Sequence, residues 1–154
     1  MSTITTNTEQ LAALVDAKLQ VLKVLVRLSR RQVEMIETGD MTMLIKLLAA
    51  KQTVMSQLQA IEQDLTPFRG EDPEHRRWAS PGQRAACQAQ AEAANGLLAE
   101  AFALEQQAEA AMLRRRDSAA AALASVQSAA DARNAYVTSA PASSVHATRL
   151  ATDA

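Results

Sequence analysis

The stretch Met35-Ile-Glu-Thr-Gly-Asp-Met-Thr-Met-Leu44 is the most informative part of this sequence, because it joins two segments with helical apolar spacing. Gly39 can adopt the left-handed conformation that ends a helix, and Asp40 can accept hydrogen bonds from the free N–H groups of the next helix. Apolar residues recur at helical three-and-four spacing on both sides of this pair. They are Leu11, Leu14, Val15, Val21, Leu22, Leu25, Leu28, Met35 and Ile36 upstream, and Leu44, Leu47, Val54, Leu58, Ile61 and Leu65 downstream. The pattern predicts two helices of about 25 to 30 residues, each roughly 40 to 45 Å long, that form an antiparallel hairpin.

A connector and a third helix are predicted after the hairpin. Thr66 precedes Pro67, and a proline disfavours helical geometry in the residue before it, so we expect a connector over residues 66–80. Ser80-Pro-Gly-Gln83 is typical of a helix start, with Ser80 as the cap and Gln83 completing a capping box. The stretch from residue 85 to 132 holds 20 alanines in 48 residues, which favours a long helix.

The predicted fold class is therefore all-α, an antiparallel helical hairpin plus a long third helix. Together they would form an elongated, coiled-coil-like three-helix bundle in one domain of residues 1–137. The helices are expected at about 8–38, 41–65 and 81–136. Residues 138–154 lack apolar periodicity and predict a disordered C-terminal tail.

Composition narrows the function classes. The chain has 154 residues with 48% hydrophobic but only 3% aromatic residues, which suits elongated helix packing better than a β-rich globule. A net charge of -1 gives no electrostatic reason to expect nucleic acid or an acidic membrane as a partner. The N-terminus does not resemble a secretory signal, no apolar run approaches 18 residues, and the single cysteine Cys87 fits a reducing compartment. We expect a cytoplasmic protein without stable membrane insertion.

Residues that could carry chemistry do not form a recognisable site in the sequence. His75 and His146 have no cysteine or carboxylate at metal-ligand spacing, and Cys87 has no histidine near it in sequence to act as a base. Two carboxylate pairs at helical spacing lack the Glu-x-x-His partners of di-iron bundles and are interpreted as solvated; they are Glu34 with Glu37 and Glu105 with Glu109. We therefore expect no metal, no cofactor and no enzymatic activity.

Basic residues are the other candidates for a binding role. They cluster at Arg27, Arg30 and Arg31, at Arg76 and Arg77, and at Arg114, Arg115 and Arg116. No aromatic residues interleave with them for base stacking, which argues against nucleic-acid binding. Lys51 occupies a heptad position between Leu47 and Val54, where a charge usually lies at a bundle edge or sets register; recognition of a partner is the alternative.

An apolar stripe runs along the third helix and becomes thinner toward its end. Its first part is Leu97, Ala101, Leu104, Ala108 and Ala111, and its second part is Ala119, Leu123, Val126, Ala130 and Val137. Alanine buries little apolar surface, so residues from about Asp117 onward gain less free energy by docking on the hairpin. We expect the last four to six turns to be loosely held or to project. The alternative is that Leu123 and Val126 belong to an ordinary bundle core.

The segment from Leu22 to Leu65 resembles the FlgN-type flagellar export chaperones. The resemblance rests on Glu37-Thr-Gly-Asp40, on Met43-Leu-Ile-Lys-Leu-Leu and on the run Lys51-Gln-Thr-Val-Met-Ser-Gln-Leu-Gln-Ala-Ile-Glu62. In that family a first helix ends in a Gly-Asp turn, and a proline-containing loop leads to a long third helix. The order of elements is similar over roughly residues 9–137.

This resemblance implies a cytoplasmic chaperone that keeps the hook-associated (hook-filament junction) proteins soluble for flagellar type III secretion. In the family, the C-terminal part of the last helix binds a C-terminal helical segment of the substrate, and a nearby tyrosine docks to the export gate. The corresponding partner-binding residues here are Met112, Ala119, Leu123, Val126, Ala130, Tyr136 and Val137. Val137 stands where the family has a glycine after the tyrosine.

A different class of protein would use the same stripe. In a non-catalytic coiled-coil adaptor or homo-oligomeric scaffold, the third helix would pair with its own copy in a homodimer. The scaffold hypothesis predicts a stable dimer that loses solubility when Leu123 is replaced by a charged residue. The chaperone reading predicts that Leu123→Glu leaves the fold intact and removes substrate binding.

Overall fold

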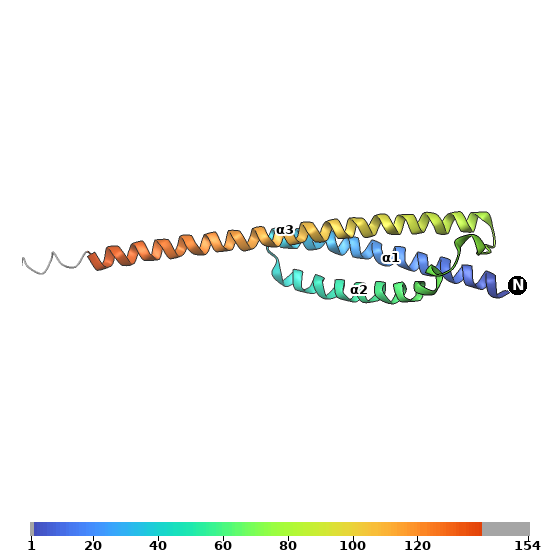
Figure 1. Cartoon of the computed structure of the whole chain (residues 1–154). Coiled ribbons are helices and arrows are strands. Elements are labelled where there is room, and N and C mark those ends of the chain that lie inside the picture. Colours follow the sequence, from blue (N-terminus) through green and yellow to red (C-terminus); the bar gives the residue numbers. More distant parts are fainter. Residues whose placement is uncertain (1, 140–154) are drawn as a thin grey trace, which may run out of the picture. The chain divides into compact units, whose positions relative to one another are not determined.

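The computed structural model describes residues 2–139, with side chains from residue 7 onward, and these residues are helical apart from short connections (Figure 1). Helix α1 spans Ser2–Thr38, α2 spans Met41–Arg69 and α3 spans Pro81–Ser139, and a short 3-10 helix, η1, spans Pro73–His75. Residues 2–139 contain no β-strand, which confirms the predicted all-α class for this part of the chain. The prediction of a disordered tail over residues 140–154 lies outside the described residues, as does His146.

The chain divides into two compact units. The first unit comprises residues 1–112 and holds α1, α2, η1 and the part of α3 up to Met112. The second unit begins at Leu113, and its described part, residues 113–139, is the remainder of α3. No helix within residues 2–139 is long and apolar enough to cross a membrane.

The turn between α1 and α2 forms as the Gly39-Asp40 pair predicts. Gly39 has a φ of 79°, in the left-handed region that glycine enters without a Cβ clash. The backbone N–H groups of Gly39 and Asp40 both donate to the carbonyl oxygen of Met35, at 3.0 and 3.1 Å. A carboxylate oxygen of Asp40 accepts from the N–H of Met43 at 3.1 Å and caps α2. Both predicted roles of this dipeptide are confirmed.

Three hydrophobic clusters form the core of the first unit, and each contains residues of α1, α2 and α3. The turn cluster is Ile36, Leu44, Ala108 and Ala111; the central cluster is Leu19, Leu22, Leu25, Val26, Val54, Leu58, Ala94, Ala101 and Leu104; the Trp78 cluster is Leu11, Val15, Leu65, Phe68 and Cys87, with Trp78 packed against them. From the turn cluster through the central cluster to the Trp78 cluster, the residue numbers increase along α2 and decrease along α3. The two helices therefore run in opposite directions within the first unit. Within this unit α1 and α2 contact each other along their length (Figure 1).

Helix α2 does not end before Pro67 as expected but continues through it to Arg69. Pro67 lacks a backbone N–H and costs about 3 kcal/mol or more within a helix. Phe68, however, is buried in the Trp78 cluster, and burying such a side chain contributes roughly 1.5–3 kcal/mol. The side chain of Arg76 also donates to the carbonyl oxygen of Phe68 at 2.6 Å, in addition to the backbone N–H of Glu71, which donates to the same oxygen at 3.3 Å. These tertiary contacts offset much of the proline's cost.

The outer helix ends also extend beyond the predicted bounds. Helix α1 begins at Ser2 rather than near residue 8, because no glycine or proline interrupts the first turns and each added residue gains a backbone hydrogen bond. Helix α3 ends at Ser139, so Thr138 and Ser139 are helical and not part of the predicted tail. Their hydroxyls hydrogen-bond to carbonyl oxygens in the preceding turn, including that of Tyr136 for Ser139.

The start of α3 follows its sequence signature. The Ser80 hydroxyl accepts from the backbone N–H of Gln83 at 3.1 Å, and Pro81 is the first helical residue. The Gln83 side chain accepts from the N–H of Ala79 at 3.1 Å, one residue earlier than in the usual capping box. The cap at the start of α3 is therefore formed by local hydrogen bonds.

Candidate functional site

The second unit presents the apolar stripe of α3 to solvent. Every described residue from Leu113 to Ser139 is exposed, and Leu123 and Val126 keep 67% and 66% of their surface accessible. Within the described chain these two residues therefore do not belong to a packed core. The stripe residues Ala119, Leu123, Val126, Ala130 and Val137 follow helical spacing over 19 residues, or roughly 27 Å from the first to the last.

Two other candidate partner-binding residues differ from this stripe. Met112 is exposed but belongs to the first unit. Tyr136 is 75% exposed and lies about 100° around the helix from its neighbour Val137, because successive helical residues rotate by that angle. Tyr136 is also about 140° around the helix from Leu123, so it lies to one side of the stripe and not within it.

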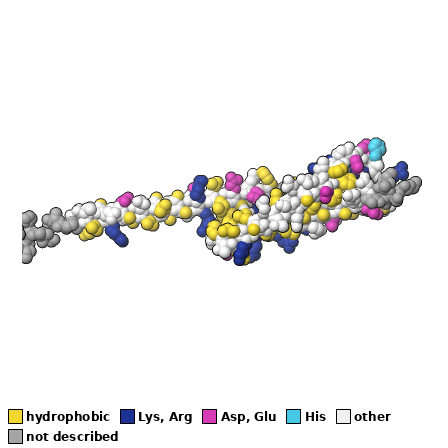
Figure 2. Space-filling view, turned by 90° about the horizontal axis from the view of Figure 1, so that it is seen from below, with side chains coloured by type: hydrophobic (Ala, Val, Ile, Leu, Met, Phe, Trp, Pro, Cys, Tyr) yellow, Lys and Arg dark blue, Asp and Glu magenta, His cyan; other side chains and the backbone are white. Residues whose placement is uncertain are grey.

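Sequence reasoning missed a groove in the first unit. It has a volume of about 1100 Å³ and lies between α2 and α3, with Leu25 and Ser29 of α1 also in its lining. Its walls carry four exposed apolar side chains, Leu48 and Met55 from α2 and Leu98 and Phe102 from α3. A second stripe on α2, comprising Met41, Ile45, Leu48 and Met55, is the sequence signal that could have found it. Figure 2 shows hydrophobic side chains gathered at the end of this unit where α2 begins.

A polar contact among three helices forms part of the lining of this groove, because Lys51 and Glu105 both line it. The ammonium group of Lys51 donates to the side-chain oxygen of Gln32 at 2.8 Å and forms an ion pair with Glu105. Lys51 is only 12% exposed at its side chain, and burial lowers the pKa of its ammonium group. The expected register-setting role of Lys51 now has named partners on α1 and α3. Glu105 is exposed, as its interpretation as a solvated carboxylate predicts, and it also pairs with Lys51.

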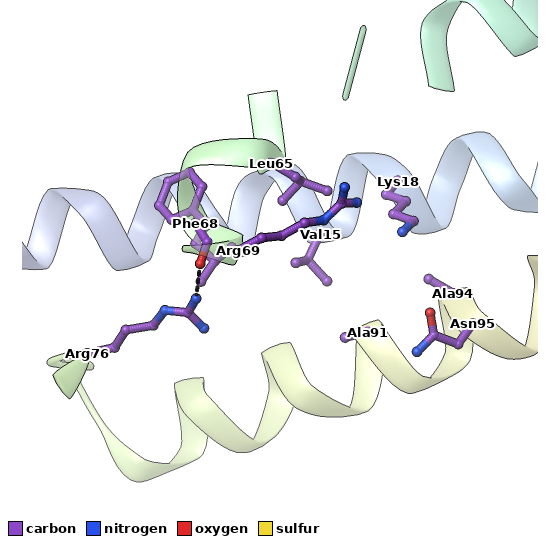
Figure 3. Close-up of a pocket in the computed structure, with 10 residues that line it drawn as sticks. Val15, Lys18, Leu65, Phe68, Arg69, Arg76, Ala91, Ala94 and Asn95 are labelled. Atoms are coloured by element: carbon purple, nitrogen blue, oxygen red, sulfur yellow. Dashed lines mark hydrogen bonds between the residues drawn. The ribbon is translucent and has the colours of Figure 1, made fainter. Parts of the chain in front are cut away.

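A smaller hollow of about 170 Å³ combines apolar and cationic residues at the other end of the first unit (Figure 3). Lys18 of α1, Arg69 of α2 and Arg76 of the connector line it, together with Leu65 and other apolar side chains. Glu62 binds Lys18 at 2.6 Å and also pairs with Arg69. Burial raises the pKa of Glu62, but hydrogen bonds and positive charge from Lys18 and Arg69 outweigh that effect and leave it lowered.

Two potentially reactive side chains elsewhere in the described chain, Cys87 and His75, differ in exposure. Cys87 is buried in the Trp78 cluster, and this burial raises the pKa of its thiol despite the opposing positive charge of Arg76. His75 is exposed and lies 3.2 Å from a carboxylate oxygen of Asp72. Within residues 2–139, no three histidine, cysteine or carboxylate side chains come together in a way that could hold a metal ion.

One arginine from each of the three basic clusters contacts a different part of the chain. Arg30 pairs with Glu100 of α3, Arg76 is held by the carbonyl of Phe68, and Arg116 pairs with the adjacent Asp117 at 3.2 Å. Glu34, Glu37 and Glu109 are exposed, as their interpretation as a solvated face predicts.

Comparison with known proteins gives no further assignment. No protein-family model, curated protein or solved structure gives a significant match to this chain.

Proposed function

We propose that this protein is a cytoplasmic export chaperone of the FlgN type. It would bind a C-terminal helical segment of hook-associated flagellar proteins and keep them soluble for flagellar type III secretion. The observation that carries the proposal is the exposed apolar stripe over residues 119–137. The resemblance over Leu22 to Leu65 supports the choice of family, and the packing of all three helices in residues 1–112 supports an elongated three-helix bundle built on an α1–α2 hairpin.

The physical mechanism is helix addition. A substrate helix lies along the stripe and buries the side chains of Leu123 and Val126, which would otherwise remain in water. An interface of roughly 1,000–1,600 Å² that also orders a flexible segment is consistent with micromolar affinity, because ordering consumes part of the interaction free energy. Reversible binding of this strength allows release at the export gate.

Tyr136 has a separate place in this proposal. Because it lies about 100° around the helix from Val137 and is 75% exposed, it can remain accessible while a substrate covers the stripe. This separation supports a role for Tyr136 in docking to the export gate.

Calorimetric titration with C-terminal fragments of hook-associated proteins from the same organism tests the proposal. Full-length protein should bind with micromolar or tighter affinity, and Leu123→Glu and a truncation ending at Arg116 should both lose binding while remaining folded. Ala121→Glu is the matched control, since Ala121 is exposed on the same turn but lies about 160° away from Leu123. Absence of binding by folded full-length protein, or equal loss in both glutamate variants, would contradict the proposal.

The exposed stripe also supports a second candidate, a coiled-coil adaptor or homo-oligomeric scaffold. Here Leu123 and Val126 would pair with their copies in a second chain. Sedimentation analysis separates the two candidates. The scaffold predicts a stable dimer that is lost, with reduced solubility, in Leu123→Glu, whereas the chaperone requires no dimer.

A further inference from the structure

The groove between α2 and α3 and the cationic hollow of Figure 3 lie in line along α1. The α1 residues in the hollow are Leu11, Val15 and Lys18, and those in the groove are Leu25 and Ser29, so they follow one another at helical three-, four- and seven-residue steps. Asn95 of α3 lines both spaces. From residue 11 to residue 29 this surface extends over 19 residues of α1, or roughly 27 Å from the first to the last.

The apolar section has the composition of a helix-binding groove. Leu48 and Met55 form one wall, Leu98 and Phe102 form the other, and Phe102 keeps 67% of its surface exposed. Methionine and phenylalanine side chains adapt to and cover large apolar surfaces of a bound helix. A monomer rarely leaves such side chains together in a concave surface without a binding function.

The lining of this section includes one polar group that lacks a partner. Ser29 is 1% exposed, and its hydroxyl makes no hydrogen bond with any residue in the described part of the chain. An unpaired buried hydroxyl costs roughly 1–3 kcal/mol, which a hydrogen bond to an incoming group would recover. The occupant is therefore expected to present one polar side chain on an otherwise apolar face.

The other section gives the surface a charged end. Lys18, Arg69 and Arg76 carry three positive charges there, against the two carboxylates of Glu62 and Glu71 that pair with them. The Arg69 side chain is 59% exposed although it pairs with Glu62, so it can bind an additional carboxylate.

We propose that this combined surface binds an amphipathic helix of a partner protein, about five turns long, as a fourth helix of the first unit. The bound helix has an apolar face with one hydrogen-bonding side chain opposite Ser29, and carboxylates at the end that lies over Lys18, Arg69 and Arg76. This site is separate from the stripe on residues 119–137, so it extends beyond the proposed function and does not depend on it.

Titration of full-length protein with designed 18-residue helical peptides tests the proposal. Each peptide carries leucines at three-and-four spacing and a central glutamine, with an Asp-Glu pair at its C-terminal or its N-terminal end, so that both binding directions are covered. Matched peptides carry Lys-Lys in place of Asp-Glu, and a scrambled peptide controls for composition. One acidic peptide should bind at least about tenfold more tightly than its lysine counterpart, with a preference that falls as salt rises.

Variants of the chain locate the binding site. Phe102→Glu should weaken binding of the acidic peptide by about tenfold or more, whereas Leu123→Glu should leave it unchanged; the two residues are equally exposed, at 67%. Arg69→Glu should remove the preference for the acidic peptide over the lysine peptide. Far-UV circular dichroism confirms that each variant is folded.

The central hydrogen bond has its own test. Wild-type protein should prefer the peptide with central glutamine over one with central leucine, and Ser29→Ala should reverse that preference by about three- to thirtyfold. A merely structural effect of Ser29→Ala would change the affinity of both peptides equally.

Three outcomes would overturn the proposal. The first is equal binding of the acidic, basic and scrambled peptides, or no binding of any of them. The second is unchanged affinity in Phe102→Glu. The third is concentration-dependent self-association of the wild-type chain that Phe102→Glu abolishes, which would show that a second copy of this chain occupies the groove.

Discussion

Replacing Gly39 and Gly96 separately by alanine should change stability in opposite directions, although each change adds the same methyl group. Gly39 has a φ of 79°, where an L residue with a Cβ pays roughly 1–2 kcal/mol, so Gly39→Ala should destabilise the protein by that amount. Gly96 lies within α3, and a Cβ built there meets no heavy atom within 4 Å. Gly96→Ala should therefore stabilise by about 0.5–1 kcal/mol through helix propensity. The two variants should differ by roughly 1.5–3 kcal/mol.

Urea unfolding followed by the fluorescence of Trp78 measures this difference. Trp78 is the single tryptophan and packs against the Trp78 cluster, which contains Leu11 at the opposite end of α1 from Gly39. Its signal therefore reports unfolding of the first unit and is not dominated by the exposed helix of residues 113–139. A shift of the Trp78 midpoint in Gly39→Ala would show that the turn and the distant cluster unfold together.

Gly39→Asn is the matched control at the turn. Asparagine enters the left-handed region at lower cost than alanine, so this variant should fall between wild type and Gly39→Ala. Wild-type stability of Gly39→Ala would contradict this prediction, since it would mean that the positive φ of residue 39 is not required. Destabilisation by Gly96→Ala would likewise contradict the assignment of an uncrowded helical position there.

Three further predictions concern the polar residues of the first unit. Lys51→Met should destabilise the protein by about 1–3 kcal/mol, because the buried side-chain oxygen of Gln32 loses its donor. Adding Gln32→Leu should bring the stability measured in urea back to within about 1 kcal/mol of wild type. A Lys51→Met variant as stable as wild type would be inconsistent with this contact. Glu62→Gln should lower stability at pH 7 by about 0.5–1 kcal/mol. Because the pKa of Glu62 is lowered in the folded protein, its contribution to stability is present above the ordinary pKa of about 4.3 and is lost as the pH falls through the folded pKa. The stabilities of wild type and Glu62→Gln should therefore converge in acid. Cys87 should react with a thiol reagent at least about tenfold more slowly in the folded protein than in urea, because it is buried and its pKa is raised; equal rates would place it on the surface.

Features that depend on neighbouring residues could be predicted from the sequence. The left-handed glycine at residue 39, the caps at Asp40 and Ser80 and the start of α3 at Pro81 each form from side chains within about three residues of the helix end. The thinning of the α3 stripe after Asp117 also follows from local composition, and the described residues beyond Leu113 are exposed. The FlgN-type function proposed for that stripe remains a prediction.

Features that depend on distant residues could not be predicted. The continuation of α2 through Pro67 depends on the contacts of Phe68 with Leu11 and Arg76. The polar contact of Lys51 depends on Gln32 and Glu105, which belong to two other helices. The groove residues Leu48, Met55, Leu98 and Phe102 lie outside the heptad positions that the sequence pattern emphasises.

Three helices and the turn between the first two could therefore be predicted from the sequence, because helix periodicity and capping are local properties of the chain. The tertiary structure was needed to show that the groove faces of α2 and α3 remain uncovered, that the hydroxyl of Ser29 is buried, and that Lys18, Arg69 and Arg76 line one hollow. These features depend on which helices pack beside each residue. Spacing along one helix defines a face, but it does not determine whether another helix covers that face.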